Sequence, residues 1–333
     1  MLSNPTEIDA TAAASAIHRK FIWRFAASLG VVIACFALLI VCLDQAGRLP
    51  PPPLTANVCI DEKFRFLSQQ DLKNVDLIAV GSSVTWRNLD LAVVKKAGLS
   101  KHPLNVAPCY LHAGETTYFT EFLLSRMSKV KQVITVVAPR DFEQCKQPNE
   151  AFFSRPLAEA YIFEGMPSFP IYLSNLKPAL FVRDLLHIRE MRQDPQHQFS
   201  IVMDGYGSGP LYSSSDWLPE PLLVPTCFQA LAELEKVVNR HGARLIIAAF
   251  PMQPAWRDLH DPDGSLLDAF EQRLKSVLKS PTTVFVSGRQ RALQDLHYAD
   301  GVHFLWSSAQ AYTRLVMNAL TSTRAAVVPA SLE

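Results

Sequence analysis

The sequence lacks an excess of charge of either sign. Its 32 Lys and Arg residues nearly balance 31 Asp and Glu residues, which gives a net charge of +1 over 333 residues. Proteins that bind nucleic acid present a strongly basic face, and this composition predicts none. The sequence therefore argues against a nucleic-acid partner.

Several signatures of cofactor and repeat proteins are also missing. There is no P-loop and no dinucleotide-binding glycine fingerprint. The histidines and cysteines do not follow a recognised zinc spacing, and no segment repeats along the chain. We therefore predict neither a cofactor nor a metal ion.

A long uncharged run does occur once, from Phe25 to Leu43 (FAASLGVVIACFALLIVCL). At 1.5 Å per residue a helix of this length spans roughly 28 Å, about the hydrocarbon thickness of a bilayer. Arg19, Lys20 and Arg24 precede it, whereas Arg48 is the only basic residue close behind it. This bias predicts a cytoplasmic N-terminus and an exported remainder. We expect an uncleaved anchor; a cleaved signal peptide and a buried core helix are the alternatives.

The run divides the chain into segments. We expect a cytoplasmic tail over 1–24, disordered over its Ala/Ser/Thr-rich first 17 residues, the transmembrane helix over 25–43, a stiff Pro-rich linker over 44–60, a folded domain over 61–325 and a tail over 326–333. The protein would then be a single-pass protein of the inner (cytoplasmic) membrane with a periplasmic or extracellular domain.

The domain alternates strand-like and helix-like segments. Continuous apolar runs, typical of strands buried on both faces, lie at 75–81, 103–107, 132–139, 244–251 and 282–288. Helical patterns lie at 87–98, 114–129, 227–241, 264–279 and 305–321. This order predicts a flavodoxin-like three-layer α/β/α sandwich around a five-stranded parallel sheet.

One interval, 142–226, contains no strong strand and is rich in Pro, aromatic, Ser and Gly residues. We interpret it as an insertion of short helices and loops. Insertions in open α/β folds commonly lie over the carboxyl edge of the sheet, where ligands bind. The insertion then either shapes an acceptor site or is a surface excursion without a role in binding.

The first strand of the domain ends in Gly81-Ser82-Ser83 (DLIAVGSSVT). A serine at this point can attack an acyl carbon, and the amides of the following turn can hold the oxyanion that results. The same residues also suit an ordinary turn with a capping serine, or a phosphate-binding turn over 81–85.

A second polar segment, Tyr298-Ala-Asp-Gly-Val-His303, precedes the last helix. In a doubly wound sheet its loop returns to the carboxyl edge where Ser83 lies. An Asp three residues before a His can orient the imidazole, as in a serine hydrolase triad. The predicted triad is Ser83, Asp300 and His303. A metal site at His297, Asp300 and His303 is the alternative, although their spacing matches no zinc pattern.

These two segments resemble the first and last conserved blocks of the SGNH (GDSL-like) hydrolase superfamily. The resemblance covers about residues 75–321, with the insertion 142–226 outside it. The resemblance implies Ser83 as nucleophile, His303 as base and Asp300 as its orienter. It is nearest to a membrane-anchored, exported branch that acts on O-acyl groups of envelope polysaccharides. Some members of that branch also carry Gly-Ser-Ser in place of Gly-Asp-Ser.

The chain departs from the family pattern at three places. Ser82 occupies the usual position of an aspartate. The second-block glycine, an oxyanion donor in the family, has only Asn105 and Gly114 as candidate counterparts. Arg140 replaces the third-block asparagine, and its guanidinium can donate to an oxyanion.

The resemblance implies an O-acetyltransferase or acetylesterase that works through an acyl-Ser83 intermediate on an envelope polysaccharide or other glycan. A membrane O-acyltransferase is the implied acyl donor. Because of the substitutions, the alternative is a non-catalytic carbohydrate-binding or scaffold subunit of a polysaccharide assembly machine.

Four cysteines, Cys59, Cys109, Cys145 and Cys227, would lie in the exported part, where disulfides form. Four cysteines allow three pairings. We favour Cys109 with Cys145, since each follows a predicted strand end; free thiols remain the alternative.

Overall fold

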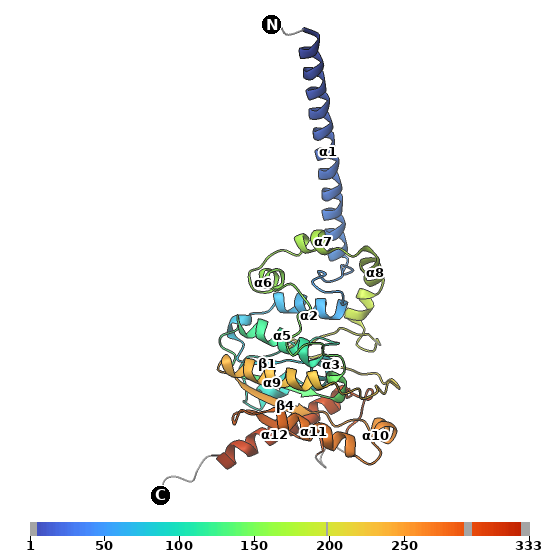
Figure 1. Ribbon diagram of the computed structural model, residues 1–333. Helices are drawn as coiled ribbons and strands as arrows, with labels where there is room; N and C mark the ends of the chain where they lie inside the picture. Colours follow the sequence, from blue (N-terminus) through green and yellow to red (C-terminus); the bar gives the residue numbers. More distant parts are fainter. Residues whose placement is uncertain (1–4, 198, 290–294, 328–333) are drawn as a thin grey trace. The chain divides into compact units, whose positions relative to one another are not determined.

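The computed structural model describes residues 5–197, 199–289 and 295–327 (Figure 1). The chain divides into two compact units, with the boundary between Leu49 and Pro50. Of the tail expected over 326–333, residues 328–333 lie outside the described part of the chain.

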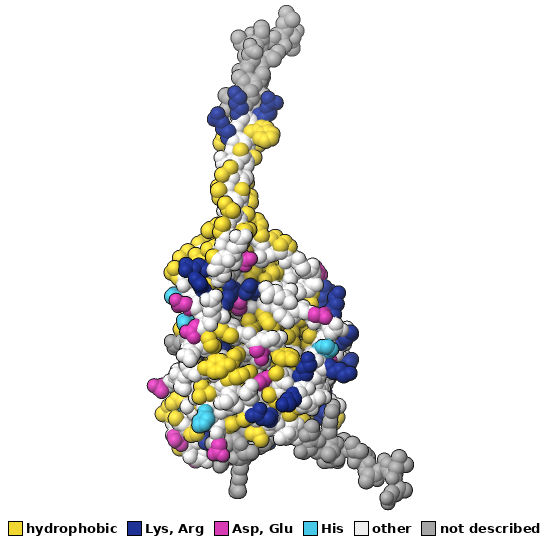
Figure 2. Space-filling view, turned by 180° about the vertical axis from the view of Figure 1, so that it is seen from behind, with side chains coloured by type: hydrophobic (Ala, Val, Ile, Leu, Met, Phe, Trp, Pro, Cys, Tyr) yellow, Lys and Arg dark blue, Asp and Glu magenta, His cyan; other side chains and the backbone are white. Residues whose placement is uncertain are grey.

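The first unit is dominated by one helix, α1 (Pro5–Gln45). Its segment His18–Gln45, with a mean hydropathy of 2.8, is long and apolar enough to cross a membrane, although a signal sequence near an N-terminus meets the same criteria. Figure 2 shows its apolar side chains, with basic side chains gathered at one end of the run. The helix already begins at Pro5, so the expected disorder is wrong over 5–17; residues 1–4 lie outside the described part of the chain. An Ala-rich sequence favours helix strongly enough to account for this.

The proline run belongs to the second unit. Pro50, Pro51, Pro52 and Leu54 are buried in the domain, and Pro53 is half-buried. The Tyr172 hydroxyl donates to the carbonyl oxygen of Pro50, and Asn175 Nδ2 donates to that of Pro53 at 3.3 Å. The run is therefore packed against the domain, within the segment 44–60 for which the sequence predicted a stiff Pro-rich linker.

The core of the second unit is a parallel five-stranded sheet in the order β2-β1-β3-β4-β5. Its strands are β1 (Leu77–Ala79), β2 (Pro103–Asn105), β3 (Gln132–Val137), β4 (Arg244–Ala249) and β5 (Val284–Val286). All five lie within the apolar runs expected to be strands. The order is that of flavodoxin-like folds, in which ligands bind beyond the carboxyl ends of β1 and β3.

Helices cover both faces of the sheet, which gives three layers (Figure 1). The cluster on one face includes residues of α2 (Val58–Ser68), α5 (Ala113–Leu124), α9 (Pro225–Arg240) and α11 (Ser265–Val277). The cluster on the other includes residues of α3 (Ser83–Asn88), α4 (Leu91–Lys96), α10 (Pro254–His260) and α12 (Trp306–Val327). Alternate strand residues supply each cluster: Ile78 and Val80 face α5, whereas Leu77 and Ala79 face α12. Two 3₁₀ turns, Leu72–Asn74 and Pro139–Phe142, complete this part.

The insertion contains the short helices α6 (Arg155–Phe163), α7 (Phe169–Asn175) and α8 (Pro178–Gln193). From residue 199 to 224 it continues without helix or strand. The long loop and the short helices α6 and α7 are what the sequence predicted, whereas α8, with 16 residues, is longer than expected.

The disulfides join Cys59 to Cys109 and Cys145 to Cys227. The expected pairing of Cys109 with Cys145 is therefore wrong. The helix α2, which the sequence analysis did not anticipate, brings Cys59 to the loop after β2. Cys227 lies at the start of α9, which packs against the 3₁₀ turn that precedes Cys145.

Candidate active site

The turn from β1 into α3 positions two serines. Gly81 has φ +141°, and a Cβ on it would lie 2.2 Å from Thr85 Oγ1, so only glycine fits. Thr85 Oγ1 in turn bonds both the amide and the carbonyl of Val136, at 2.9 Å each, which fastens α3 to β3. Ser82 caps α3 by accepting from Val84 N at 3.0 Å, and Ser83 is the first residue of the helix.

The loop before α12 is held by Asn88, at the end of the same helix α3. Asn88 Nδ2 donates to Val302 O at 2.9 Å, and its Oδ1 accepts from Phe304 N at 2.8 Å. His303 lies between these two anchored residues. Because Asn88 and Ser83 belong to one helix, the position of His303 is fixed relative to Ser83.

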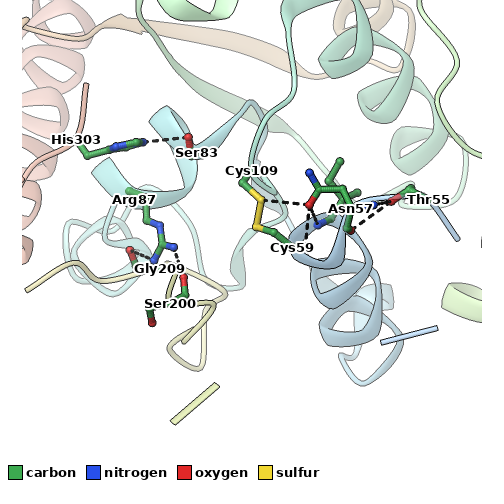
Figure 3. Close-up of a disulfide and its surroundings, with 10 residues drawn as sticks. Thr55, Asn57, Cys59, Ser83, Arg87, Cys109, Ser200, Gly209 and His303 are labelled. Atoms are coloured by element: carbon green, nitrogen blue, oxygen red, sulfur yellow. Dashed lines mark hydrogen bonds between the residues drawn. A yellow bond between two sulfur atoms is a disulfide. The ribbon is translucent and has the colours of Figure 1, made fainter. Parts of the chain in front are cut away.

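Three side chains form a continuous hydrogen-bonded chain here. His303 Nε2 lies 3.0 Å from Ser83 Oγ, and His303 Nδ1 lies 2.8 Å from Asp300 Oδ2 (Figure 3 shows the first contact). Since an ionised carboxylate only accepts, it favours the imidazole tautomer with the proton on Nδ1. Nε2 is then free to accept the Ser83 proton. Asp300 is itself oriented by Val302 N, which donates to its Oδ1 at 2.9 Å.

Ser82 faces a different partner, Asp141, which follows β3. Ser82 Oγ donates to Asp141 Oδ1 at 2.5 Å, and Ala138 N donates to Oδ2 at 2.8 Å. Burial raises the pKa of Asp141 to about 6, although these hydrogen bonds oppose the rise. The pair spans the ends of β1 and β3, the point at which strand order reverses.

Arg140, next to Asp141, is paired with Glu143. Its guanidinium carbon lies 5.6 Å from the centroid of the Trp217 ring. The Trp217 ring is in turn nearly parallel to that of His303, with 6.2 Å between centroids and 23° between planes. Arg140 therefore borders the triad through Trp217.

Asn105 and Gly114, the candidate counterparts of the family glycine, are both engaged in packing. Asn105 Nδ2 donates to Trp86 O and its Oδ1 accepts from Ala107 N, at 3.2 Å each. A Cβ on Gly114 would lie 2.4 Å from Gln147 O. Packing and hydrogen bonding therefore explain why Asn105 and Gly114 occupy these positions, whether or not either residue contacts an oxyanion.

The insertion is fastened over this edge at several points. Arg87, one turn after Ser83 in α3, donates to the carbonyls of Ser200 and Gly209 (Figure 3). Its guanidinium also stacks on Trp86, 3.7 Å from the ring centroid. Burial lowers the pKa of Arg87 to about 9, which leaves it protonated at neutral pH.

Further along, the insertion bonds the loop that carries Asp300 and His303. Ser215 N donates to Ala299 O at 2.7 Å, and Gly301 N donates to Trp217 O at 2.9 Å. Trp256 of α10 donates from Nε1 to Pro219 O at 2.6 Å. The segment 215–219 is thus held on both sides, and Trp217 is part of the site's wall.

Three residues of this site were not predicted from the sequence: Asn88, Asp141 and Trp217. Asp141 could have been found, because it follows β3 as Ser82 follows β1 and these strands are neighbours. Asn88 and Trp217 carry no local signal, since each acts through a partner more than 80 residues away in the chain.

No protein-family model matches the chain, and no curated protein is similar enough to count as a relative. Within the described residues, no group of three or more His, Cys, Asp or Glu side chains is arranged to hold a metal ion.

Proposed function

We propose that the protein is an exported serine-dependent acyl-transfer enzyme, an O-acetyltransferase or acetylesterase that acts on an envelope polysaccharide or other glycan. The observation that carries the proposal is the relay from Asp300 through His303 to Ser83, with contacts of 2.8 and 3.0 Å. A carbohydrate-binding or scaffold subunit has no need of such a relay, which favours the enzyme.

The first half-reaction forms an acyl-enzyme. Ser83 Oγ attacks the carbonyl carbon of the donor while its proton passes to His303 Nε2. Asp300 stabilises the resulting imidazolium through the Nδ1–H bond. The tetrahedral oxyanion is held by the Ser83 N–H, in the first turn of α3, where amides lack partners within the helix. Gly114 N–H and the Arg140 guanidinium are the further candidate donors. The leaving group departs with the proton from His303.

The second half-reaction transfers the acyl group. His303 accepts a proton from water or from a sugar hydroxyl, whose oxygen attacks the acyl carbon, and Ser83 Oγ recovers the proton as it leaves. The same intermediate serves an esterase and a transferase, because only the acceptor differs.

The location and the acyl donor are also part of the proposal. The candidate anchor His18–Gln45, with Arg19, Lys20 and Arg24 at its N-terminal end, supports a cytoplasmic N-terminus in the inner membrane and an exported domain. Two disulfides suit an oxidising compartment such as the periplasm. A membrane O-acyltransferase is the acyl donor that the family resemblance implies.

The test uses the full chain in detergent. We would measure p-nitrophenyl acetate turnover and trap acetyl-Ser83 by mass spectrometry, for wild type, Ser83→Ala and His303→Ala. We expect both variants to lose turnover by about 10³-fold or more, and the acetyl group to map to Ser83. Ser213→Ala and His187→Ala, at a serine and a histidine outside the relay, are the matched controls. Equal activity in all five proteins, or acetylation elsewhere, would reject the proposal.

A further inference from the structure

Trp217 is a large side chain beside the relay that is left open to solvent. It is 44% exposed, although indole is among the side chains that gain most from burial. An exposed apolar side chain next to the proposed catalytic histidine indicates a surface that a bound ligand would cover.

The position of Trp217 is fixed. Its carbonyl accepts from Gly301 N at 2.9 Å, within the loop that carries Asp300 and His303. Two residues later, Pro219 O accepts from the buried Trp256. Gly301 packs closely against the segment 217–219, because a Cβ on it would lie 3.0 Å from Pro219 Cδ and 3.1 Å from Trp217 O. The backbone that carries the indole is therefore held on both sides, so it loses little freedom when a ligand binds.

The Trp217 ring also lies close to His303, the proposed base. It is nearly parallel to the imidazole, with 6.2 Å between centroids, and the Arg140 guanidinium carbon lies over the ring, 5.6 Å from its centroid. A flat ligand on the indole would lie next to Nε2 of His303, the atom that bonds Ser83 Oγ.

A sugar ring fits this surface. The C–H groups of a pyranose form an apolar face that covers an aromatic ring, while its hydroxyls project from the rim. One of those hydroxyls would then point toward His303, which must remove its proton in the second half-reaction.

We propose that Trp217 is the stacking platform for the acceptor sugar, so that the insertion supplies the acceptor site and directs the acyl group to a glycan in preference to water. This inference rests on the proposed acyl-transfer function. It also assigns Trp217 as a specificity residue that adds to the triad and is not part of it.

The size of the effect follows from the exposed area. A tryptophan side chain buries about 150–250 Å² when covered, and 44% of it is available. Covering about 80–100 Å² corresponds to an affinity gain of about 30-fold.

The catalytic experiment compares Trp217→Ala, Trp217→Phe and Tyr212→Ala in the full chain. Tyr212 is the matched control, since it is 51% exposed in the same insertion. Acetylation of Ser83 by p-nitrophenyl acetate is measured first, then transfer to cellohexaose, chitohexaose and a hexameric polyuronate. We expect Trp217→Ala to lower the ratio of sugar transfer to acylation by about 30-fold, through the acceptor KM. Trp217→Phe should retain part of the wild-type ratio of sugar transfer to acylation, and Tyr212→Ala should match wild type. An equal loss of acylation and transfer in Trp217→Ala would overturn the inference, because it would mean that Trp217 only supports His303.

A binding experiment separates this inference from the proposed function. Ser83→Ala cannot form an acyl-enzyme, yet its Trp217 is intact. We expect one of the three oligosaccharides to bind Ser83→Ala in isothermal titration, with about 30-fold weaker binding in Ser83→Ala/Trp217→Ala. Binding of none of them, or binding that does not depend on Trp217, would overturn the platform. The two claims can also separate. If binding depends on Trp217 but the wild-type protein is never acetylated, the stacking role of Trp217 stands and the acyl-transfer function is rejected.

Discussion

Ser82 Oγ donates to Asp141 Oδ1 at 2.5 Å, between the carboxyl ends of two neighbouring strands. A hydroxyl is required here on chemical grounds, because a buried carboxylate at position 141 needs a donor. An aspartate at position 82 would instead place two acidic groups in contact. The Ser82 hydroxyl and the buried Asp141 carboxyl therefore form a matched donor and acceptor pair.

We predict that Ser82→Asp is unstable at neutral pH. Two carboxylates in one buried site cannot both ionise, so one must take up a proton. We expect unfolding at pH 8 to become easier by about 3–5 kcal/mol, with partial recovery at pH 5, where one carboxyl can donate to the other. Ser82→Ala, which loses the hydroxyl without adding charge, should be less destabilised at pH 8. It should also recover less at pH 5, because protonation then relieves the burial of one carboxylate and not the repulsion between two. Thermal unfolding at the two pH values measures this; a Ser82→Asp melting point equal to wild type at pH 8 would contradict it.

The orientation of His303 by Asp300 gives a second prediction. Asp300→Asn can still accept from Val302 N, so the loop should keep its shape. The amide favours the wrong imidazole tautomer, and we expect acylation of Ser83 to slow by about 10³–10⁴-fold. Stopped-flow measurement of p-nitrophenolate release tests it. The exposed Asp258→Asn is the control, and a loss below tenfold would show that Asp300 does not orient the base.

Asn88 should act as a positioning residue. Asn88→Ala leaves Phe304 N and Val302 O without their buried partner, which costs about 2–4 kcal/mol of unfolding free energy. Activity should fall as well, because His303 lies between the two freed groups. Asn74→Ala, at an exposed asparagine bonded to Asp71 and Lys129, should change neither. Denaturant unfolding and acylation rates are measured on the same samples, and wild-type activity in a folded Asn88→Ala would refute the positioning role.

Both disulfides should stabilise the folded domain. They close loops with sequence separations of 50 and 82 residues, and each corresponds to about 4 kcal/mol in the chain-entropy account. We expect Cys59→Ser/Cys109→Ser and Cys145→Ser/Cys227→Ser each to lose about 2–5 kcal/mol. Peptide mapping without reduction checks the pairing itself. A peptide that joins Cys109 to Cys145 would contradict the structure.

Asp61 predicts a pH dependence of stability. Burial raises its pKa to about 7 from an unfolded value of 3.8, although Thr55 donates to it twice. The folded state therefore binds this proton more tightly than the unfolded state. Its stabilising contribution is complete below about pH 4 and is lost as the pH rises through about 7.

Asp61→Asn isolates this effect. Both Thr55 bonds go to a single oxygen, so an amide can replace the carboxyl without losing either. We expect the variant to melt at a higher temperature than wild type at pH 8 and to show a shallower decline between pH 5 and 8. Asp141 maintains part of that decline, because its pKa is raised in the same direction. A steeper decline in Asp61→Asn than in wild type would be inconsistent with the account.

The sequence was enough to predict the five strands, because short continuous apolar runs such as 132–139 are typical of strands buried on both faces of a parallel sheet. It also predicted that Ser83, Asp300 and His303 lie at one edge, since parallel strands end together. It did not predict α2, whose Cys59 and Phe64 are buried by partners far along the chain. The disulfide pairing was missed for the same reason. Asn88 and Trp217 depend on contacts across the fold, which no local pattern encodes.

Ser83 and His303 are 220 residues apart in the chain, and one helix, α3, holds both ends together. During synthesis the serine emerges early and the histidine late. A nascent or prematurely terminated chain therefore carries the serine without the histidine. Only a chain that has delivered residue 303 to the folded domain can form the Ser83–His303 contact, so this contact reports that the domain is complete.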